Sequence, residues 1–159
     1  SHKSFLDNPL EMHTGHAENA IDSATHYLTG NLTIGGQEHY YLESQVALAI
    51  PTENKELVVH SSTQNPTEVQ HLVAHVLDIP QHSVEVITRR MGGGFGGKET
   101  DSSQLACICA LFAQQTQCPV KARLSRGDDM LMTGKRHDFK VDYRVGFDDQ
   151  GRIAGIVID

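Results

Sequence analysis

The sequence predicts an α+β fold in which a mixed sheet is combined with two main helices and a C-terminal β-hairpin. Short apolar runs typical of strands recur along the 159 residues, and two longer segments carry apolar residues at helical spacing. Near the end of the chain, Asp148-Asp149-Gln150-Gly151 separates two apolar stretches, which indicates a hairpin. Because strands and helices are mixed and the chain closes with a hairpin, the α+β class is favoured.

The N-terminal part of the sequence is expected to divide at about residue 24. Residues 1–24 contain few apolar side chains and are expected to form a polar, partly ordered lead-in, whereas residues 25–159 are expected to form one domain. Strands are then predicted at residues 26–29, 32–34, 46–50 and 56–61, with a turn at residues 35–36 and a strand end at Pro51.

The first main helix has a well-marked start. Asn65 is expected to cap it, Pro66 to occupy its first position and Glu68 to complete a capping box. Its end is expected at Ile79-Pro80. The inward face is expected to carry Val69, Leu72, Val73, Val76 and Leu77. The elements predicted after it are a strand at 83–88, a helix with the apolar run 105–112, a strand at 120–124 and a turn or short helix around 128–130.

The most distinctive motif is the glycine-rich loop GGGFGGKE at residues 92–99, between a predicted strand and a predicted helix. So many glycines weaken the backbone and indicate that another group approaches it closely. The loop satisfies the G-x-G-x-x-G spacing of dinucleotide sites, as would any segment this rich in glycine. It also satisfies G-x-x-x-x-G-K, but Glu99 stands where a P-loop needs Ser or Thr to hold magnesium. A nucleotide site is therefore disfavoured, and a tight turn without a ligand stays open as an alternative.

Two further blocks accompany this loop, GGQEHYYLE at residues 35–43 and STQN at residues 62–65. In this order and spacing, the three blocks resemble the molybdenum-binding region of the xanthine dehydrogenase family. The resemblance extends from about Asn31 through LMTGKRH at residues 131–137 to the last strand. It implies that the chain is an N-terminal fragment of a larger molybdenum-binding domain. It also implies a molybdenum-molybdopterin cofactor in the complete enzyme.

The resemblance implies roles for single residues. Gln64 matches a glutamine whose amide hydrogen-bonds an oxygen ligand of molybdenum, and Phe95 and Gly96 match residues whose backbone reaches the metal centre. No direct protein ligand of the metal is expected. Glu99 matches a carboxylate that binds and orients the purine, a position where the related aldehyde oxidases usually carry an apolar residue. Glu99 also stands at the predicted helix start, where the helix dipole favours a carboxylate without any substrate.

The activity implied by the resemblance is purine hydroxylation, which converts hypoxanthine and xanthine to urate. Electrons would pass to iron-sulfur clusters, FAD and NAD on other domains or subunits. The family's general base, second substrate arginine and most pterin contacts fall in segments beyond residue 159, so the segment alone is expected to be inactive. The expected partners are the remaining molybdenum-binding segment and the iron-sulfur and FAD domains. Open alternatives are a cofactor-free binding or assembly module, an aldehyde-oxidising member of the family and, more distantly, a mononucleotide-binding protein.

Charge and composition exclude several other classes. The net charge of −7 disfavours nucleic acids and anionic membranes, which would repel an acidic chain. Cys107, Cys109 and Cys118 lack a C-x-x-C spacing and are expected to be reduced thiols rather than cluster ligands. The sequence shows no signal-peptide pattern and no apolar run of membrane-spanning length. A cytoplasmic location is therefore expected.

Several polar residues allow an ordinary structural interpretation. His71 and His75 have the i, i+4 spacing of zinc ligands, but no third ligand is apparent, and a surface or packing pair is favoured. Adjacent acids at Asp128-Asp129 are expected to be solvated or to cap a turn. Lys98 is expected either to balance an anion or to be solvated. The acidic and histidine side chains of the first family block are expected to be hydrogen-bonding supports, namely Glu38, His39 and Glu43.

Overall fold

The computed structural model describes residues 10–159, which fold as two compact units. The central unit comprises Gly36–His137, and the terminal unit comprises residues 10–35 together with Asp138–Asp159. Residues 10–24 therefore belong with the C-terminal hairpin instead of forming a separate lead-in. The physical reason is that a strand directly after them pairs with the first strand of that hairpin.

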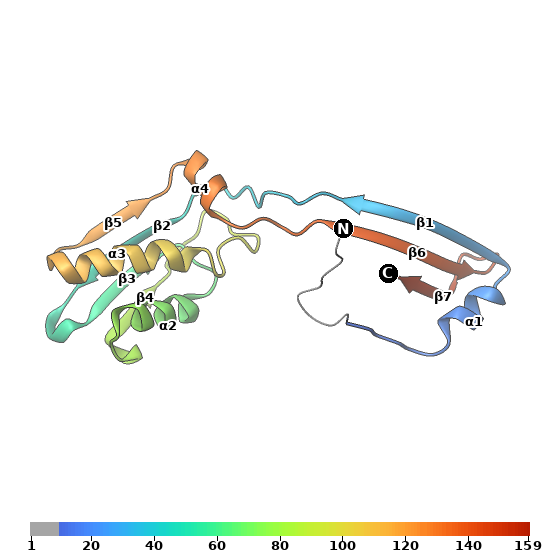
Figure 1. Cartoon of the computed structure of the whole chain (residues 1–159), viewed down its shortest axis with the longest axis horizontal. Helices are drawn as coiled ribbons and strands as arrows, with labels where there is room; N and C mark the ends of the chain where they lie inside the picture. Colours follow the sequence, from blue (N-terminus) through green and yellow to red (C-terminus); the bar gives the residue numbers. More distant parts are fainter. Residues whose placement is uncertain (1–9) are drawn as a thin grey trace, which may run out of the picture. The chain divides into compact units, whose positions relative to one another are not determined.

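The central unit is built on a four-stranded mixed sheet in the order β4-β3-β2-β5 (Figure 1). Its strands are β2 (Val46–Pro51), β3 (Leu57–Ser61), β4 (Val84–Ile87) and β5 (Val120–Arg123). Only β3 and β4 run parallel, because α2 (Pro66–Leu77) crosses over between them, while the other pairs are antiparallel. Short 3-10 turns precede β3 and β4, at Glu53–Lys55 and Gln81–Ser83.

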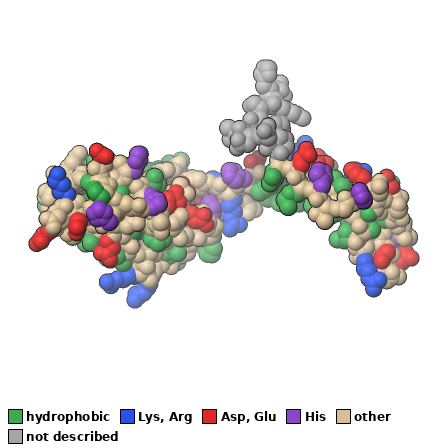
Figure 2. Space-filling view, turned by 90° about the horizontal axis from the view of Figure 1, so that it is seen from below, with side chains coloured by type: hydrophobic (Ala, Val, Ile, Leu, Met, Phe, Trp, Pro, Cys, Tyr) green, Lys and Arg blue, Asp and Glu red, His purple; other side chains and the backbone are tan. Residues whose placement is uncertain are grey.

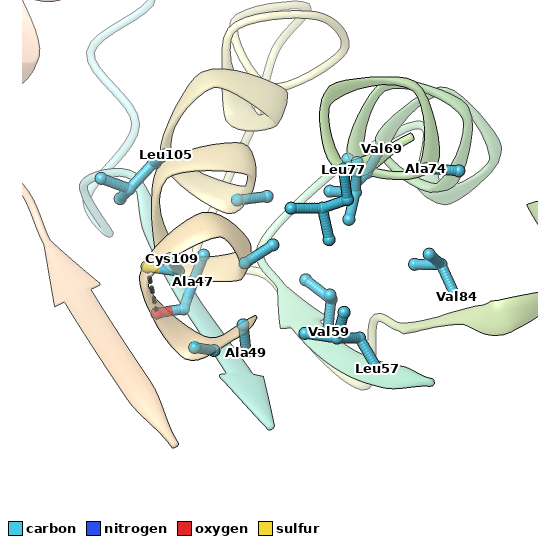
Figure 3. Close-up of a cluster of buried hydrophobic side chains, with 14 residues drawn as sticks. Ala47, Ala49, Leu57, Val59, Val69, Ala74, Leu77, Val84, Leu105 and Cys109 are labelled. Atoms are coloured by element: carbon cyan, nitrogen blue, oxygen red, sulfur yellow. Dashed lines mark hydrogen bonds between the residues drawn. The ribbon is translucent and has the colours of Figure 1, made fainter. Parts of the chain in front are cut away.

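The core of this unit lies between the sheet and two helices, α2 and α3 (Ser102–Thr116). Alternating strand residues point into it, such as Ala47 and Ala49 from β2 and Leu57 and Val59 from β3. Figure 3 shows these side chains meeting those of the two helices, with the Cys109 thiol 3.6 Å from the Ala47 carbonyl oxygen. The sheet and both predicted main helices thus form a layered α+β core, which confirms the expected fold class.

The start of α2 agrees with the sequence. The Asn65 side chain accepts a hydrogen bond from the Glu68 N–H at 3.2 Å, as expected for the N-cap, and donates to the Glu68 carboxylate at 3.0 Å. The reciprocal bond of a capping box does not form, because the Asn65 N–H donates to the Thr63 hydroxyl at 3.0 Å. The helix ends at Leu77, where Asp78 adopts the left-handed conformation. The expected inward position of Val76 is wrong: this side chain is 49% exposed, because the buried stripe runs through Val69, Val73, Ala74 and Leu77.

The second main helix begins later than expected. The apolar run lies within α3, but the helix starts at Ser102 and residues 95–101 form turns and bends. A short helix, α4 (Arg126–Met132), follows β5 and is capped by the Ser125 hydroxyl, which accepts from the Asp128 N–H at 3.2 Å. The start of α4 is therefore capped by a side chain, as is the start of α2.

The terminal unit is a three-stranded antiparallel sheet in the order β1-β6-β7. Its elements are α1 (Ala17–Asp22), β1 (His26–Ile34), β6 (Phe139–Phe147) and β7 (Ile153–Ile158). The predicted hairpin turn is confirmed, with the Gly151 N–H donating to the Asp148 carbonyl at 2.9 Å. A Cβ at Gly146 would stand 2.8 Å from the Ile21 backbone, so the glycine lets α1 lie directly on the hairpin.

The surface carries charges of both signs. On the face seen in Figure 2, acidic, basic and histidine side chains are interspersed, and lysines and arginines do not gather into one large patch. A surface mixed in this way lacks the basic stripe that a phosphate backbone would need on this face. No helix in the described part of the chain is long and apolar enough to cross a membrane.

Candidate cofactor site at the glycine loop

The glycine loop is hydrogen-bonded to Gln64, which follows β3 just before α2. The Gln64 Oε1 atom accepts from the N–H groups of Gly96, at 3.0 Å, and Lys98, at 3.2 Å. The Gln64 N–H donates in turn to the Lys98 carbonyl at 2.8 Å. Gln64 and Gly96 are 32 residues apart, and the structure brings these two predicted site residues into direct contact. The Gln64 Nε2 group makes no hydrogen bond within residues 10–159 and is left as a neutral donor.

Several glycines of the loop are required by close neighbours. A Cβ at Gly94 would stand 2.5 Å from Gln64 Oε1, and one at Gly97 would stand 2.7 Å from both the His39 and Tyr41 rings. At Gly92 a Cβ would stand 2.5 Å from the Glu43 Cβ. The lack of side chains on this loop therefore has a cause within the protein, because the first family block and Gln64 already fill the space.

Phe95 lies at the exposed tip of the loop. Its side chain is 63% exposed and its φ is +53°, a left-handed conformation that costs a residue with a large side chain of order 1–3 kcal/mol. The Phe95 carbonyl accepts a hydrogen bond from Arg136 Nη2 at 3.4 Å. Backbone strain of this kind is concentrated at ligand-binding sites, where the surrounding contacts maintain it.

An ion pair between the buried Lys98 and the partly exposed Glu43 lies beneath the loop. The Lys98 side chain is 0% exposed, and its Nζ donates to Glu43 Oε2 and to the Ser62 hydroxyl, each at 3.0 Å. The same Glu43 oxygen accepts from the Gly92 N–H at 3.0 Å and from the Ser62 hydroxyl at 2.5 Å. Burial alone would raise the pKa of Glu43, but these hydrogen bonds and the Lys98 ammonium outweigh burial and lower the pKa to about 2. Lys98 thus balances an anion, the first of its two expected roles, and Glu43 is a hydrogen-bonding support as expected.

A carboxylate that is fully buried, Asp129, supports the same region from α4. Asp129 accepts from the Tyr41 hydroxyl and from the Gln45 N–H, both at 2.6 Å. The Gln45 Nε2 group donates to Tyr41 and, at 3.0 Å, to the Gly97 carbonyl. Burial and the bond to Asp129 raise the pKa of Tyr41 to about 12. The expectation that both adjacent acids are solvated or capping is therefore wrong for Asp129, which is buried and links α4 to the loop.

Glu99 directly follows the buried Lys98 in the sequence, but its own side chain is exposed. Within the described residues its carboxylate makes no hydrogen bond or ion pair. The helix α3 begins three residues later, at Ser102. The helix dipole acts mainly on charges within the first turn, and Glu99 lies outside that turn. The structural alternative, a carboxylate held by a helix start, is thereby weakened.

The remaining candidates do not form a metal site. Within residues 10–159 no group of three or more histidine, cysteine or carboxylate side chains could hold a metal ion. His71 and His75 are exposed on α2. Cys109 is buried and Cys118 is exposed, and burial raises the pKa of Cys107 and Cys109. Sequence reasoning missed the burial of Asp129 and left the role of Lys98 open. The available signals were the capping serine before Asp129 and the lysine within a glycine loop.

The chain matches known proteins over its whole length. Residues 1–159 match the family described as molybdopterin cofactor-binding domain. The chain is 46% identical to a probable aldehyde oxidase of Caenorhabditis elegans over 91% of its length, and 42% identical to a xanthine dehydrogenase of Calliphora vicina over 99%. It spans only 12% of the length of each of these relatives.

Solved structures show the same fold. Quinoline 2-oxidoreductase from Pseudomonas putida 86 has a TM-score of 0.73 at 22% identity, covering 90% of this chain and 18% of that chain. Carbon monoxide dehydrogenase from Oligotropha carboxidovorans has a TM-score of 0.74 at 20% identity, covering 89% of this chain and 18% of that chain. At these identities the structures define the fold of the segment and not its substrate.

Proposed function

Because the chain belongs to the molybdenum hydroxylase family as part of a molybdopterin cofactor-binding domain, we propose that it forms one wall of the molybdenum site of a xanthine dehydrogenase. The complete enzyme would hydroxylate purines. The remaining molybdenum-binding segment would complete the site, and iron-sulfur, FAD and NAD centres on other domains or subunits would carry the electrons. The segment by itself would be inactive.

The residues around the loop fit a molybdenum-pterin group. Gln64 offers a neutral amide donor whose acceptor end is already fixed by Gly96 and Lys98, so the free Nε2 hydrogens have a defined direction. A neutral donor suits an oxygen ligand because it does not titrate with pH. When bound, the group supplies oxygen transfer to an electron-poor carbon and accepts the electrons released. In this arrangement Gln64 would orient an oxygen ligand of the group, and the strained Phe95 backbone would line the site.

The purine assignment depends on one observation, the exposed carboxylate of Glu99 three residues after Gly96, which has no hydrogen-bond or ion-pair partner within residues 10–159. A carboxylate accepts hydrogen bonds from the N–H groups of a purine ring, and such charge-assisted bonds are worth about 1.5–3 kcal/mol. An aldehyde has no N–H group to donate. Glu99 would therefore favour purines over aldehydes and steady the charge that develops on the ring during hydroxylation.

A second candidate function is aldehyde oxidation. The similarity that favours it is the 46% identity to a probable aldehyde oxidase, which is as strong as the similarity to the xanthine dehydrogenases. A cofactor-free assembly module of the same fold is a third candidate, and the molybdenum content of the complete protein separates it from the other two.

The test is Glu99→Val in the complete enzyme that contains this segment. Purine turnover per molybdenum should fall by about tenfold or more, since about 1.4 kcal/mol corresponds to one decade, while aldehyde turnover is largely retained. A matched control is Glu85→Val, which removes an exposed carboxylate from strand β4, where valine is well tolerated. Equal losses on both substrate classes would assign Glu99 a structural role, and a complete protein without molybdenum would exclude both enzyme functions.

A further inference from the structure

The buried charge of Lys98 has no evident reason in stability. Burying an ammonium is unfavourable unless it is paired, and the Lys98 side chain is fully buried. Methionine has a similar volume, and replacing a buried ion pair by apolar side chains is often neutral or stabilising. Stability alone therefore does not account for the pair of Lys98 and Glu43, and the segments that it holds in place do.

The pair connects three separate segments through a single oxygen atom. Glu43 Oε2 accepts from Ser62, which follows β3, from Gly92 at the start of the glycine loop and from Lys98 at its end. The Lys98 ammonium also lies 4.8 Å from the centre of the Tyr41 ring. The two ends of the loop are thereby held against the first family block.

The same lysine holds Gln64 through its backbone. The Lys98 N–H donates to Gln64 Oε1 at 3.2 Å, and the Lys98 carbonyl accepts from the Gln64 N–H at 2.8 Å. A shift of the Lys98 main chain would therefore move Gln64. The second bond to Oε1, which the Gly96 N–H donates, depends on the loop keeping its conformation. Lys98 thus links the ion pair, which its side chain forms, to the Gln64 amide, which its backbone binds.

We propose that Lys98 and Glu43 are positioning residues, whose ion pair fixes the orientation of the Gln64 amide so that its Nε2 hydrogens face the ligand. The identity of that ligand rests on the proposed function, whereas the positioning itself is a property of this chain alone. With the pair in place, the N–H groups of Gly96 and Lys98 bind Oε1, and Nε2 has no partner among residues 10–159. Without it, the loop ends separate and the amide loses its fixed direction.

The test is amide hydrogen exchange, measured by NMR on the full 159-residue chain without cofactor. In Lys98→Met, exchange of the Gly96 N–H should accelerate by about tenfold or more, because its acceptor on Gln64 is no longer held, and the Gln64 side-chain amide signal should broaden or shift. Core amides such as those of Val59 and Cys109 should change by less than about twofold. A purely structural role would accelerate all of these amides together.

Two further variants keep the test decisive. Lys98→Met/Glu43→Gln removes both charges, leaves no unpaired buried charge and should show the same local acceleration in a folded chain. Lys135→Met is the matched control, because Lys135 forms a 3.0 Å ion pair with Glu38 near the surface and should leave Gly96 unchanged. A folded variant without the pair that keeps wild-type Gly96 protection and an unchanged Gln64 signal would overturn the proposal. The outcome does not depend on purine turnover, so failure here and failure of the proposed function are distinguishable.

Discussion

Substituting Gly94 by alanine should damage the site far more than the fold. The new Cβ would stand 2.5 Å from Gln64 Oε1, whereas ordinary contacts begin near 3.4 Å, so the amide must move by about 1 Å. That movement weakens two hydrogen bonds, from Gly96 and Lys98, at about 0.5–1.5 kcal/mol each. Alanine also lowers the conformational entropy of the unfolded chain, which stabilises the folded state by about 0.4–1 kcal/mol. The net loss of folding free energy is therefore only about 0–2.5 kcal/mol.

The effect on activity should be much larger. A misplacement of about 1 Å in a positioning group can reduce turnover on the order of a hundredfold. The measurements are urea unfolding of the 159-residue chain and turnover per molybdenum of the complete enzyme. Gly127→Ala is the control, because its Cβ would meet only the Ser125 hydroxyl, at 3.9 Å, and should leave turnover unchanged. Wild-type turnover in folded, molybdenum-loaded Gly94→Ala would refute the placement of Gln64 at the metal.

Two further predictions concern stability. Glu43 has a pKa of about 2 in the folded chain and an ordinary value of 4.5, so its ionised form stabilises the fold above about pH 4.5 and this contribution is lost as the pH falls toward 2. Urea unfolding at stepped pH should show this loss, and Glu43→Gln should flatten it; an equal slope in both chains would contradict the reasoning. Asn65→Ala should cost about 1 kcal/mol of unfolding free energy through loss of the α2 cap, whereas Thr67→Ala in the same turn should change it by less than about 0.5 kcal/mol. Equal effects of the two substitutions would contradict the capping role.

The sequence predicted those features that depend on neighbours along the chain. Alternating apolar residues predicted the strands, and the Asn65, Pro66 and Glu68 pattern predicted the start of α2, because capping bonds join residues only three positions apart. The glycine loop and Gln64 were predicted as one site through their resemblance to a family, and the hydrogen bond between Gln64 and Gly96 brings them together.

The tertiary structure decided the features that depend on distant segments. The pairing of β1 with β6 joins residues more than one hundred positions apart, and no local sequence pattern predicts such a pairing. Because of this pairing, residues 10–24 belong to the terminal unit and do not form the expected lead-in. The burial of Lys98 and Asp129 could not be predicted either, because both residue types are normally exposed. Both are buried here only because carboxylate, hydroxyl and backbone partners from other segments converge on them, and such convergence exists only in the folded chain.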